Sequence, residues 1–396
     1  MAEYKIAFLI SHPTQYHSPI FRELAKRPNI DLTVYFCSRI GAEEHLDEGF
    51  GKVYKWDIPV LEGYKSIFLQ NISPWPSFSF LGQIHPGILK ELKRGKYDAL
   101  IVHGYTFLTF WLAFWGARIY KIPLILKGEA DMEKKLIFPK SFIKKIILTP
   151  LFKRAAAFLY SYNLNKEFFK FYGAKEKKLF FSPSAVDNDF FQNRRQELKN
   201  KKASIKKDLG IKNTSLPNIL FVGKFIPRKR VMDILKAAVV LKSDVVFNIL
   251  LLGDGEERNK LADFARMNNL GNVHFIGFKN QSELPRFYSV ADIFVLPSKY
   301  DPSPKAVQEA MNFGLPIITS DGVKTAPDLI LSGGCGFVYP MGDISALAER
   351  IKKVLSDNSL RTNFGKNAFT TVSKWNLEEN TRSIVNAVQY VVNARK

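Results

Sequence analysis

Short apolar runs alternate with segments of helical period along most of the chain. Segments such as "SPIFRELAKR" place apolar residues three or four positions apart, as an amphipathic helix requires. Alternation of strand, helix and strand predicts a parallel sheet with helices on both faces. The runs in the first half that predict buried strands are "KIAFLI" (5–10), "DLTVYFC" (31–37), "DALIVHG" (98–104), "PLILKG" (123–128) and "AFLYS" (157–161).

The same alternation starts again after a polar, basic stretch. We predict an α/β fold of two doubly wound domains that face a central cleft, with ligands at the carboxyl ends of the strands. The second series of predicted strands is 218–224, 245–255, 273–278, 292–298, 315–321 and 336–340. The predicted parts are an N-terminal domain 1–190, a linker 191–216, a C-terminal domain 217–375 and a terminal helix 376–396 that returns to one of the domains.

Length and charge agree with two domains and point to anionic partners. A chain of 396 residues exceeds the size at which one core usually stops growing. Its formal charge of +21 indicates phosphate-bearing substrates, polyanions or an anionic membrane. The two cysteines, Cys37 and Cys335, are expected to be reduced thiols, and the N-terminus lacks a signal-peptide pattern, so we expect a cytosolic chain. The apolar segment 105–117 is too short to span a membrane and predicts a buried helix.

Two glycine turns in the second half follow predicted strands. In "FVGKFIPRKRVMDILKAA" (221–238), Lys224 and Lys229 follow a strand that ends in Gly223, and a helix is expected to start near Arg228. Two cations at that place can neutralise a pyrophosphate, although a solvated basic turn explains the same residues. The turn in "LLGDGEERNKLADFA" (251–265) is a usual place for a nucleotide base or ribose.

The stretch "YDPSPKAVQEAMNFGLPIITSD" (300–321) places two carboxylates, Asp301 and Glu309, eight positions apart. If a helix begins near Pro304, one acid lies in the loop before it and the other lies one to two turns inside it. The first amides of a helix attract anions. The arrangement therefore suits a ligand with phosphates at one end and hydroxyls at the other.

The order and spacing of these motifs resemble a known enzyme family. "VGKFIPRKR", "GDGEER" and the stretch from "NVHFIGF" to "NFGLPI" are similar to the C-terminal half of family 4 retaining glycosyltransferases, which have the GT-B fold. The resemblance is close over residues 216–370. "ISHPTQYHSPIFRELAKR", "YDALIVHGY" and "LYSYNLNKEFFKFYGAKEKKLFFSPSAVD" resemble the acceptor domain of the same enzymes.

The resemblance implies roles for matching positions in the C-terminal half. Lys224 and Lys229 would hold the donor diphosphate, and Glu309 would accept hydrogen bonds from the ribose. Asp301 replaces the first Glu of the family pattern and is expected near the donor sugar. Pro304 replaces a Gly whose amide meets the ligand in the family. The remaining implied donor-binding residues are Gly223, Gly253, Asp254, Gly255, Phe278, Ser303, Lys305 and Ala306.

The first half departs from the family at its opening loop. "SHPTQYHSP" stands where the family has a Gly-Gly loop, with Gln15 and Tyr16 at the glycine positions and His12 and His17 on either side. We expect this loop to close over the donor phosphates or the acceptor, the alternative being surface histidines.

Three further residues follow predicted strands of the first half. His103 is expected to face the cleft, unless it is a core histidine. Near the anomeric carbon, where the family has a His, the candidates are Lys127 and Glu129. The position of Asp187 and Asp189 at the domain exit predicts a turn and no metal site.

A basic and aromatic stretch between residues 133 and 178 predicts contact with an anionic membrane, or else a solvated helix face. Its apolar residues are Ile137, Phe138, Phe142, Ile143, Ile146 and Ile147.

The resemblance as a whole implies an activity. The implied enzyme is a metal-independent, retaining hexosyltransferase without a cofactor. It would transfer a sugar from a UDP- or GDP-sugar to a glycan or lipid-linked acceptor at the cytoplasmic face of the membrane. No nucleic-acid partner is expected. The rivals are a GT-B-fold epimerase, a phosphosugar synthase and a non-catalytic basic protein that binds polyanions.

Overall fold

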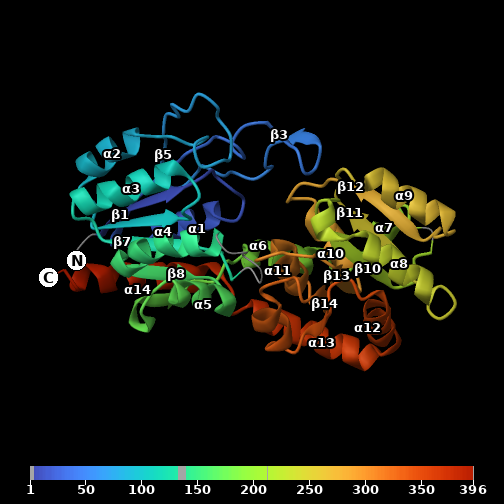
Figure 1. Ribbon diagram of the computed structural model, residues 1–396. Coiled ribbons are helices and arrows are strands. Elements are labelled where there is room, and N and C mark those ends of the chain that lie inside the picture. Colours follow the sequence, from blue (N-terminus) through green and yellow to red (C-terminus); the bar gives the residue numbers. More distant parts are fainter. Residues whose placement is uncertain (1–3, 133–139, 212, 396) are drawn as a thin grey trace. The chain divides into compact units, whose positions relative to one another are not determined.

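The computed structural model describes residues 4–132, 140–211 and 213–395, which form two compact units (Figure 1). Unit 1 consists of Met1–Glu44, Pro59–Ser184 and Leu377–Lys396, and unit 2 of His45–Ile58 and Ala185–Asn376. The chain therefore enters unit 2 twice, first as a short excursion and then as one long segment.

Unit 1 is built on a seven-stranded sheet in the order β5-β2-β1-β6-β7-β8-β9, with every neighbouring pair parallel. The five strands predicted from the sequence are confirmed, and the structure adds the short edge strands β5 and β9. Continuous apolar runs identified the central strands because these strands are buried on both faces. The bounds are β1 Tyr4–Ile10, β2 Ile30–Phe36, β5 Lys65–Phe68, β6 Ala99–His103, β7 Leu124–Gly128, β8 Ala157–Tyr160 and β9 Leu179–Phe181.

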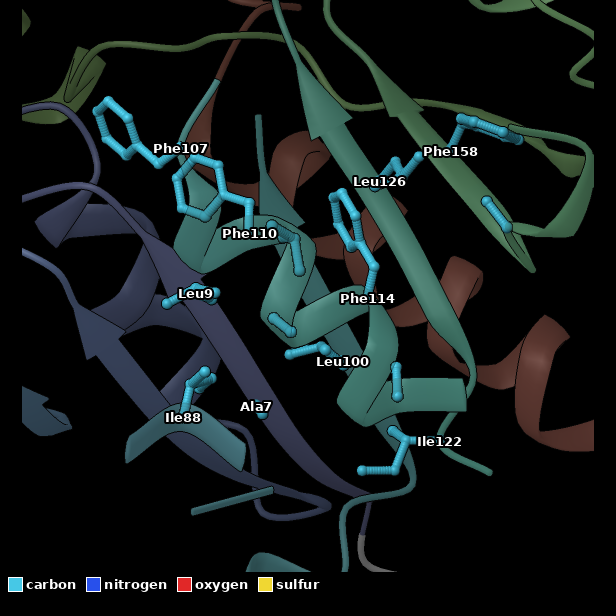
Figure 2. Packing of buried hydrophobic residues seen from close by; sticks show 14 of the residues in the cluster. Ala7, Leu9, Ile88, Leu100, Phe107, Phe110, Phe114, Ile122, Leu126 and Phe158 are labelled. Atoms are coloured by element: carbon cyan, nitrogen blue, oxygen red, sulfur yellow. The ribbon is translucent and has the colours of Figure 1, made fainter. Parts of the chain in front are cut away.

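Helices cover both faces of this sheet and form two apolar clusters. One face carries α1 (Ser18–Ala25) and α14 (Leu377–Asn393), whose apolar side chains pack against alternate residues of the central strands. The cluster on the other face is shown in Figure 2, where Phe110 and Phe114 lie over Leu100 and Leu126. Its helices are α2 (Gly87–Gly95), α3 (Leu108–Ile119), α4 (Lys140–Arg154) and α5 (Asn163–Phe171).

The prediction that 105–117 forms a buried helix is wrong for one side of α3. Trp115 is 66% exposed, although Phe110 and Phe114 are buried, and Ile119, beyond the predicted segment at the end of the same helix, is 64% exposed. When a helical segment is apolar on all sides, its sequence has no polar face that would indicate which side is exposed.

Unit 2 is built on a six-stranded parallel sheet in the order β12-β11-β10-β13-β14-β15. All six strands predicted for this half are confirmed. Their bounds are β10 Asn218–Val222, β11 Asn248–Leu252, β12 Val273–Gly277, β13 Ile293–Leu296, β14 Ile317–Ser320 and β15 Gly336–Tyr339. The helices that follow them are α8 Met232–Leu241, α9 Arg258–Met267, α10 Leu284–Val290, α11 Lys305–Asn312, α12 Ile344–Ser356 and α13 Asn358–Val372.

The segment 191–216, predicted as a linker, is largely helical. It contains most of α6 (Asn188–Leu198) and all of α7 (Lys202–Asp208), which pack on α10, and α6 also packs on α11. Asp187 does not lie in a simple turn, because its side chain accepts a 3.0 Å hydrogen bond from the Phe190 amide and caps α6.

The excursion into unit 2 is an antiparallel hairpin that the sequence did not predict. Strand β3 (His45–Asp47) pairs with β4 (Lys52–Tyr54) around the turn Glu48–Gly51. The side chains of Leu46 and Val53 are 61% and 62% exposed, so the hairpin has no buried apolar face of its own. Its position depends on contacts with loops of unit 2.

Candidate functional site

The glycine turns after β10 and β11 lie against each other at the carboxyl edge of the unit 2 sheet. The Gly223 amide donates to the Leu252 carbonyl, and the Phe225 amide donates to the Asp254 carbonyl over 2.8 Å. Gly253 has a φ of 143°, and a Cβ there would lie 1.8 Å from the Gly223 carbonyl oxygen. Only glycine permits this approach, so the two turns form one continuous backbone surface.

Lys229 is held by Asp301 beside this surface. Its ammonium forms an ion pair with the Asp301 carboxylate, and only 14% and 9% of the two side chains are exposed. The helix expected near Arg228 starts later: residues Pro227–Lys229 form a 3₁₀ turn, and α8 begins at Met232. The turn points Lys229 back toward Gly223, where a Cβ would lie 3.9 Å from the lysine Cε.

Lys224 is held by the hairpin, through a residue that the sequence analysis missed. Its Nζ donates to both carboxylate oxygens of Asp47, over 2.7 and 2.8 Å, and lies 4.9 Å from the centre of the Phe50 ring. Burial raises the pKa of Asp47, but the hydrogen bond and charge of Lys224 together with the amides of Phe50 and Gly49 outweigh burial, so the pKa lies below its ordinary value. Asp47 is the immediate electrostatic partner of a lysine predicted to bind phosphate.

Further contacts tie the hairpin to the second turn. Lys52 forms a 2.9 Å ion pair with Asp254, whose pKa is lowered because Lys52, the Gly255 amide and Arg258 together outweigh the effect of burial. Phe50 and Tyr54 pack on the candidate residue Phe278, with ring centres 4.9 and 4.6 Å apart. The sequence signal that announces a hairpin is present in "DEGFGKVY", where two glycines separate two short strands.

Helix α11 begins after Pro304, as the stretch 300–321 predicted. Pro304 is its N-cap, and the Lys305 ammonium lies 3.2 Å from the Ser303 hydroxyl. Ala306 lies in the first turn, where backbone amides have no partner four residues earlier. Glu309 is only 1% exposed and accepts a 2.7 Å hydrogen bond from the Tyr288 hydroxyl. The role predicted for Glu309 toward a ribose remains a prediction.

The opening loop of unit 1 brings two of its candidate residues, His12 and His17, into polar contacts. The His12 Nδ1 lies 2.9 Å from the Ser11 hydroxyl, and the His17 Nδ1 lies 2.8 Å from the Thr14 hydroxyl. The rings of His17 and His103 meet edge to face, with centres 4.9 Å apart. The loop therefore places two of the predicted imidazoles beside each other at the carboxyl ends of β1 and β6.

The other candidates of unit 1 differ in accessibility. Gln15 is 3% exposed, whereas Tyr16 is half-buried. Lys127 is 4% exposed and donates to the Ser182 hydroxyl over 2.9 Å. Glu129 follows β7 with a half-buried side chain, and its carbonyl accepts a 2.6 Å hydrogen bond from Tyr162. Of the two alternatives, Glu129 is thus the more accessible.

Four of the six apolar residues predicted to contact a membrane are exposed on α4. The exposed fractions of Phe142, Ile143, Ile146 and Ile147 lie between 47% and 56%. Residues 137 and 138 lie outside the described residues. Ile147 also lines a groove of about 500 Å³ together with Trp115 and two arginines, Arg118 and Arg154.

Within the described ranges, no helix is long and apolar enough to cross a membrane. In that same part of the chain, no three His, Cys, Asp or Glu side chains gather as metal ligands do.

The sequence matches a described family in its second half. The family Glycosyl transferases group 1 matches residues 201–371. The N,N'-diacetylbacillosaminyl-diphospho-undecaprenol alpha-1,3-N-acetylgalactosaminyltransferase of Campylobacter jejuni is 30% identical over 55% of this chain and 56% of its own. The UDP-Gal:alpha-D-GlcNAc-diphosphoundecaprenol alpha-1,3-galactosyltransferase of Escherichia coli is 27% identical over 69% and 70%. The lipopolysaccharide core biosynthesis glycosyltransferase LpsE of Rhizobium meliloti is 29% identical, and the match covers 44% of its length. The chain spans about half the length of most of these relatives.

Solved structures match nearly the whole chain. A glycosyltransferase from Rickettsia africae has a TM-score of 0.78 at 15% identity and covers 99% of both chains. HepE of Anabaena, in complex with UDP and glucose, has a TM-score of 0.72 at 16% identity and covers 98% of this chain and 100% of its own. The fold is therefore GT-B, as the sequence predicted.

Proposed function

We propose that this chain, which belongs through residues 201–371 to the Glycosyl transferases group 1 family, transfers a sugar from a nucleotide-diphosphate donor to a glycan or lipid-linked acceptor. The observation that carries the proposal is the placement of Lys224 and Lys229 beside the glycine turns of β10 and β11. Both ammonium groups are compensated by carboxylates, Asp47 for Lys224 and Asp301 for Lys229. A diphosphate supplies the same negative charge with more acceptor atoms.

The donor assignment follows from the chemistry of this edge of the sheet. The backbone surface of Gly223 and Gly253 allows phosphate oxygens to approach closely, and the two lysines offset their charge. We infer UDP or GDP as the nucleotide, and the structure of HepE with UDP supports the former. No cofactor and no metal ion take part in the proposed reaction.

We propose a front-face displacement that retains the anomeric configuration. The bond between the anomeric carbon and the diphosphate oxygen breaks while the acceptor oxygen bonds to the same face of the sugar. The acceptor proton passes to the leaving diphosphate. Lys224 and Lys229 stabilise the charge that grows on the leaving group, which is the largest contribution expected from a preorganised site. Asp301 orients Lys229, and Glu129, His103 and the opening loop are assigned to unit 1's acceptor side.

Names of the relatives support a lipid-linked acceptor. Those of Campylobacter jejuni and Escherichia coli are named for diphosphoundecaprenol-linked sugars. Such an acceptor lies in a membrane, and the exposed residues of α4 have the composition of an interfacial helix with lysines among the apolar side chains. We propose that α4 holds the enzyme at the anionic cytoplasmic face.

Vesicle flotation tests the membrane part separately. The variant Ile143→Glu replaces an apolar residue that is 51% exposed on α4, and Val240→Glu makes the same change at a 55% exposed position on α8. We expect only the first to lose binding to phosphatidylglycerol vesicles. Equal binding of the vesicles by both variants would show that α4 does not contact the membrane.

Product analysis tests the reaction itself. The protein is incubated with UDP- and GDP-sugars, with EDTA, and with or without a diphospholipid-linked sugar. We expect a new glycosidic bond that retains the donor's anomeric configuration in the nuclear magnetic resonance spectrum. Conversion of the nucleotide sugar without an acceptor would instead indicate an epimerase, and transfer to a free sugar phosphate would indicate a phosphosugar synthase.

A further inference from the structure

A cavity of unit 2 lies at the edge of its sheet opposite the glycine turns. It has a volume of about 840 Å³ and is lined by residues at the amino ends of β13 and β14, such as Ala291 and Pro316, and by α6, α10 and α13. Donor binding is assigned to the carboxyl edge, so the proposed reaction does not use this cavity. Its volume lies in the range of cavities that hold small organic ligands.

The lining of this cavity is strongly basic. Five cationic side chains face one carboxylate, Asp292, which is already engaged by Lys202 over 2.9 Å and by the Asn218 amide over 2.8 Å. Four cations remain without a carboxylate in the lining. They are Arg195 and Lys199 of the α6 end, and Arg361 and Lys366 of α13.

Arg195 is a partly buried cation of this lining. Its guanidinium lies 4.7 Å from the centre of the Phe369 ring and forms no ion pair with any described residue. It also lies over Gly314, where a Cβ would be 3.2 Å from Nη2. Burial lowers the pKa of Arg195, because the charge is removed from water without a compensating anion.

The local backbone offsets only a small part of this charge. Helix α11 ends at Asn312, and its C-cap residue Phe313 lines the cavity. A helix C-terminus carries roughly half a negative charge. Arg361 donates to the Val354 and Leu355 carbonyls and to the Asn358 side chain, all of which are neutral. The cavity therefore keeps several unneutralised positive charges beside an apolar wall of Leu198, Leu315 and Phe369.

We propose that this cavity binds a phosphorylated small molecule, with its phosphoryl group on Arg195, Arg361 and Lys366. Guanidinium groups bind phosphate through paired N–H donors, which gives Arg195 a geometry that lysine lacks. A phosphate ion alone fills a small part of 840 Å³, so the ligand includes an uncharged body the size of a sugar. This proposal does not depend on the donor assignment.

Titration calorimetry at constant ionic strength tests the proposal, with inorganic phosphate and glucose 6-phosphate as probes. The variant Arg195→Met keeps an apolar chain against Phe369 but removes the charge. The matched control is Arg194→Met on the same helix, because Arg194 pairs with Glu197 and does not line the cavity. Lys366→Gln changes an exposed residue and serves as a second variant that leaves the packing intact.

We expect glucose 6-phosphate to bind the unmodified protein more tightly than inorganic phosphate. Arg195→Met should weaken both at least tenfold and Lys366→Gln about threefold, whereas Arg194→Met and the donor-site variant Lys229→Met should bind as the unmodified protein does. Equal losses in Arg195→Met and Arg194→Met would show a general charge effect and overturn the proposal. Loss of binding in Lys229→Met, or no binding of either probe, would overturn it as well.

Discussion

Replacing Asp47 by Asn should strengthen the binding of a nucleoside diphosphate. In the structure, the Asp47 carboxylate occupies the ammonium of Lys224 with both oxygens. A donor diphosphate that binds Lys224 must compete with this carboxylate. Asparagine keeps an oxygen that accepts from the Gly49 and Phe50 amides, as Asp47 does over 2.9 and 3.2 Å, so the hairpin turn is preserved.

The size of the effect follows from the exposure of the pair. The side chains of Lys224 and Asp47 are 32% and 17% exposed. Hydrogen bonds to charged groups contribute about 1.5–3 kcal/mol when buried, and exposed ion pairs contribute about 0.2–1 kcal/mol. A value of about 1–2 kcal/mol lies between these limits, which corresponds to about a 5- to 30-fold lower dissociation constant.

Titration calorimetry with the preferred nucleoside diphosphate measures this effect. The control is Glu48→Gln, which makes the same charge change at an exposed position of the same hairpin. We expect tighter binding for Asp47→Asn and no change for Glu48→Gln. Weaker binding by Asp47→Asn would refute the competition and show that the carboxylate orients Lys224 for the ligand.

Three further predictions concern stability and reactivity. Lys229→Met leaves the Asp301 carboxylate buried without its cation, which destabilises the fold by about 3 kcal/mol. Scanning calorimetry should therefore show a melting temperature lower by about 6–12 °C. Adding Asp301→Asn in a double variant should largely restore the melting temperature. An unchanged melting temperature would mean that the pair is not formed. Burial raises the pKa of the Cys37 and Cys335 thiols to about 12, so neither should react with a thiol reagent at pH 8 until the protein unfolds, and rapid labelling would contradict their burial. Because the pKa of Asp254 is lowered in the folded state, its contribution to hairpin docking is present above about pH 4 and is lost as the pH falls further. Amide exchange of residues 45–58 should therefore show a loss of protection at low pH only.

The sequence predicted both sheets because the central strands are mainly apolar. β11 is an example, since all five of its residues are buried between helices. The glycine turns after β10 and β11 were equally visible, because a glycine after a buried strand marks a close backbone approach. These local signals predict a candidate donor site at the carboxyl edge of the unit 2 sheet.

Partners of the candidate residues depend on contacts between distant parts of the chain. Lys224 meets Asp47 across 177 positions, and Lys229 meets Asp301 across 72. The strands of the hairpin that carries Asp47 are only three residues long, too short for a recognisable alternation, and their apolar residues Leu46 and Val53 are exposed. Periodicity within a segment does not report such pairings, since they are fixed by tertiary packing.

A nucleotide-binding screen tests the central claim most directly. UDP, GDP, ADP and dTDP are titrated with EDTA against the unmodified protein, Lys229→Met and Lys236→Met, the last changing an exposed lysine of α8. We predict that at least one nucleoside diphosphate binds the unmodified protein and Lys236→Met equally, and binds Lys229→Met at least tenfold more weakly. Binding that is the same in all three proteins, or absent from the unmodified protein, would contradict a donor site at the carboxyl edge of the unit 2 sheet.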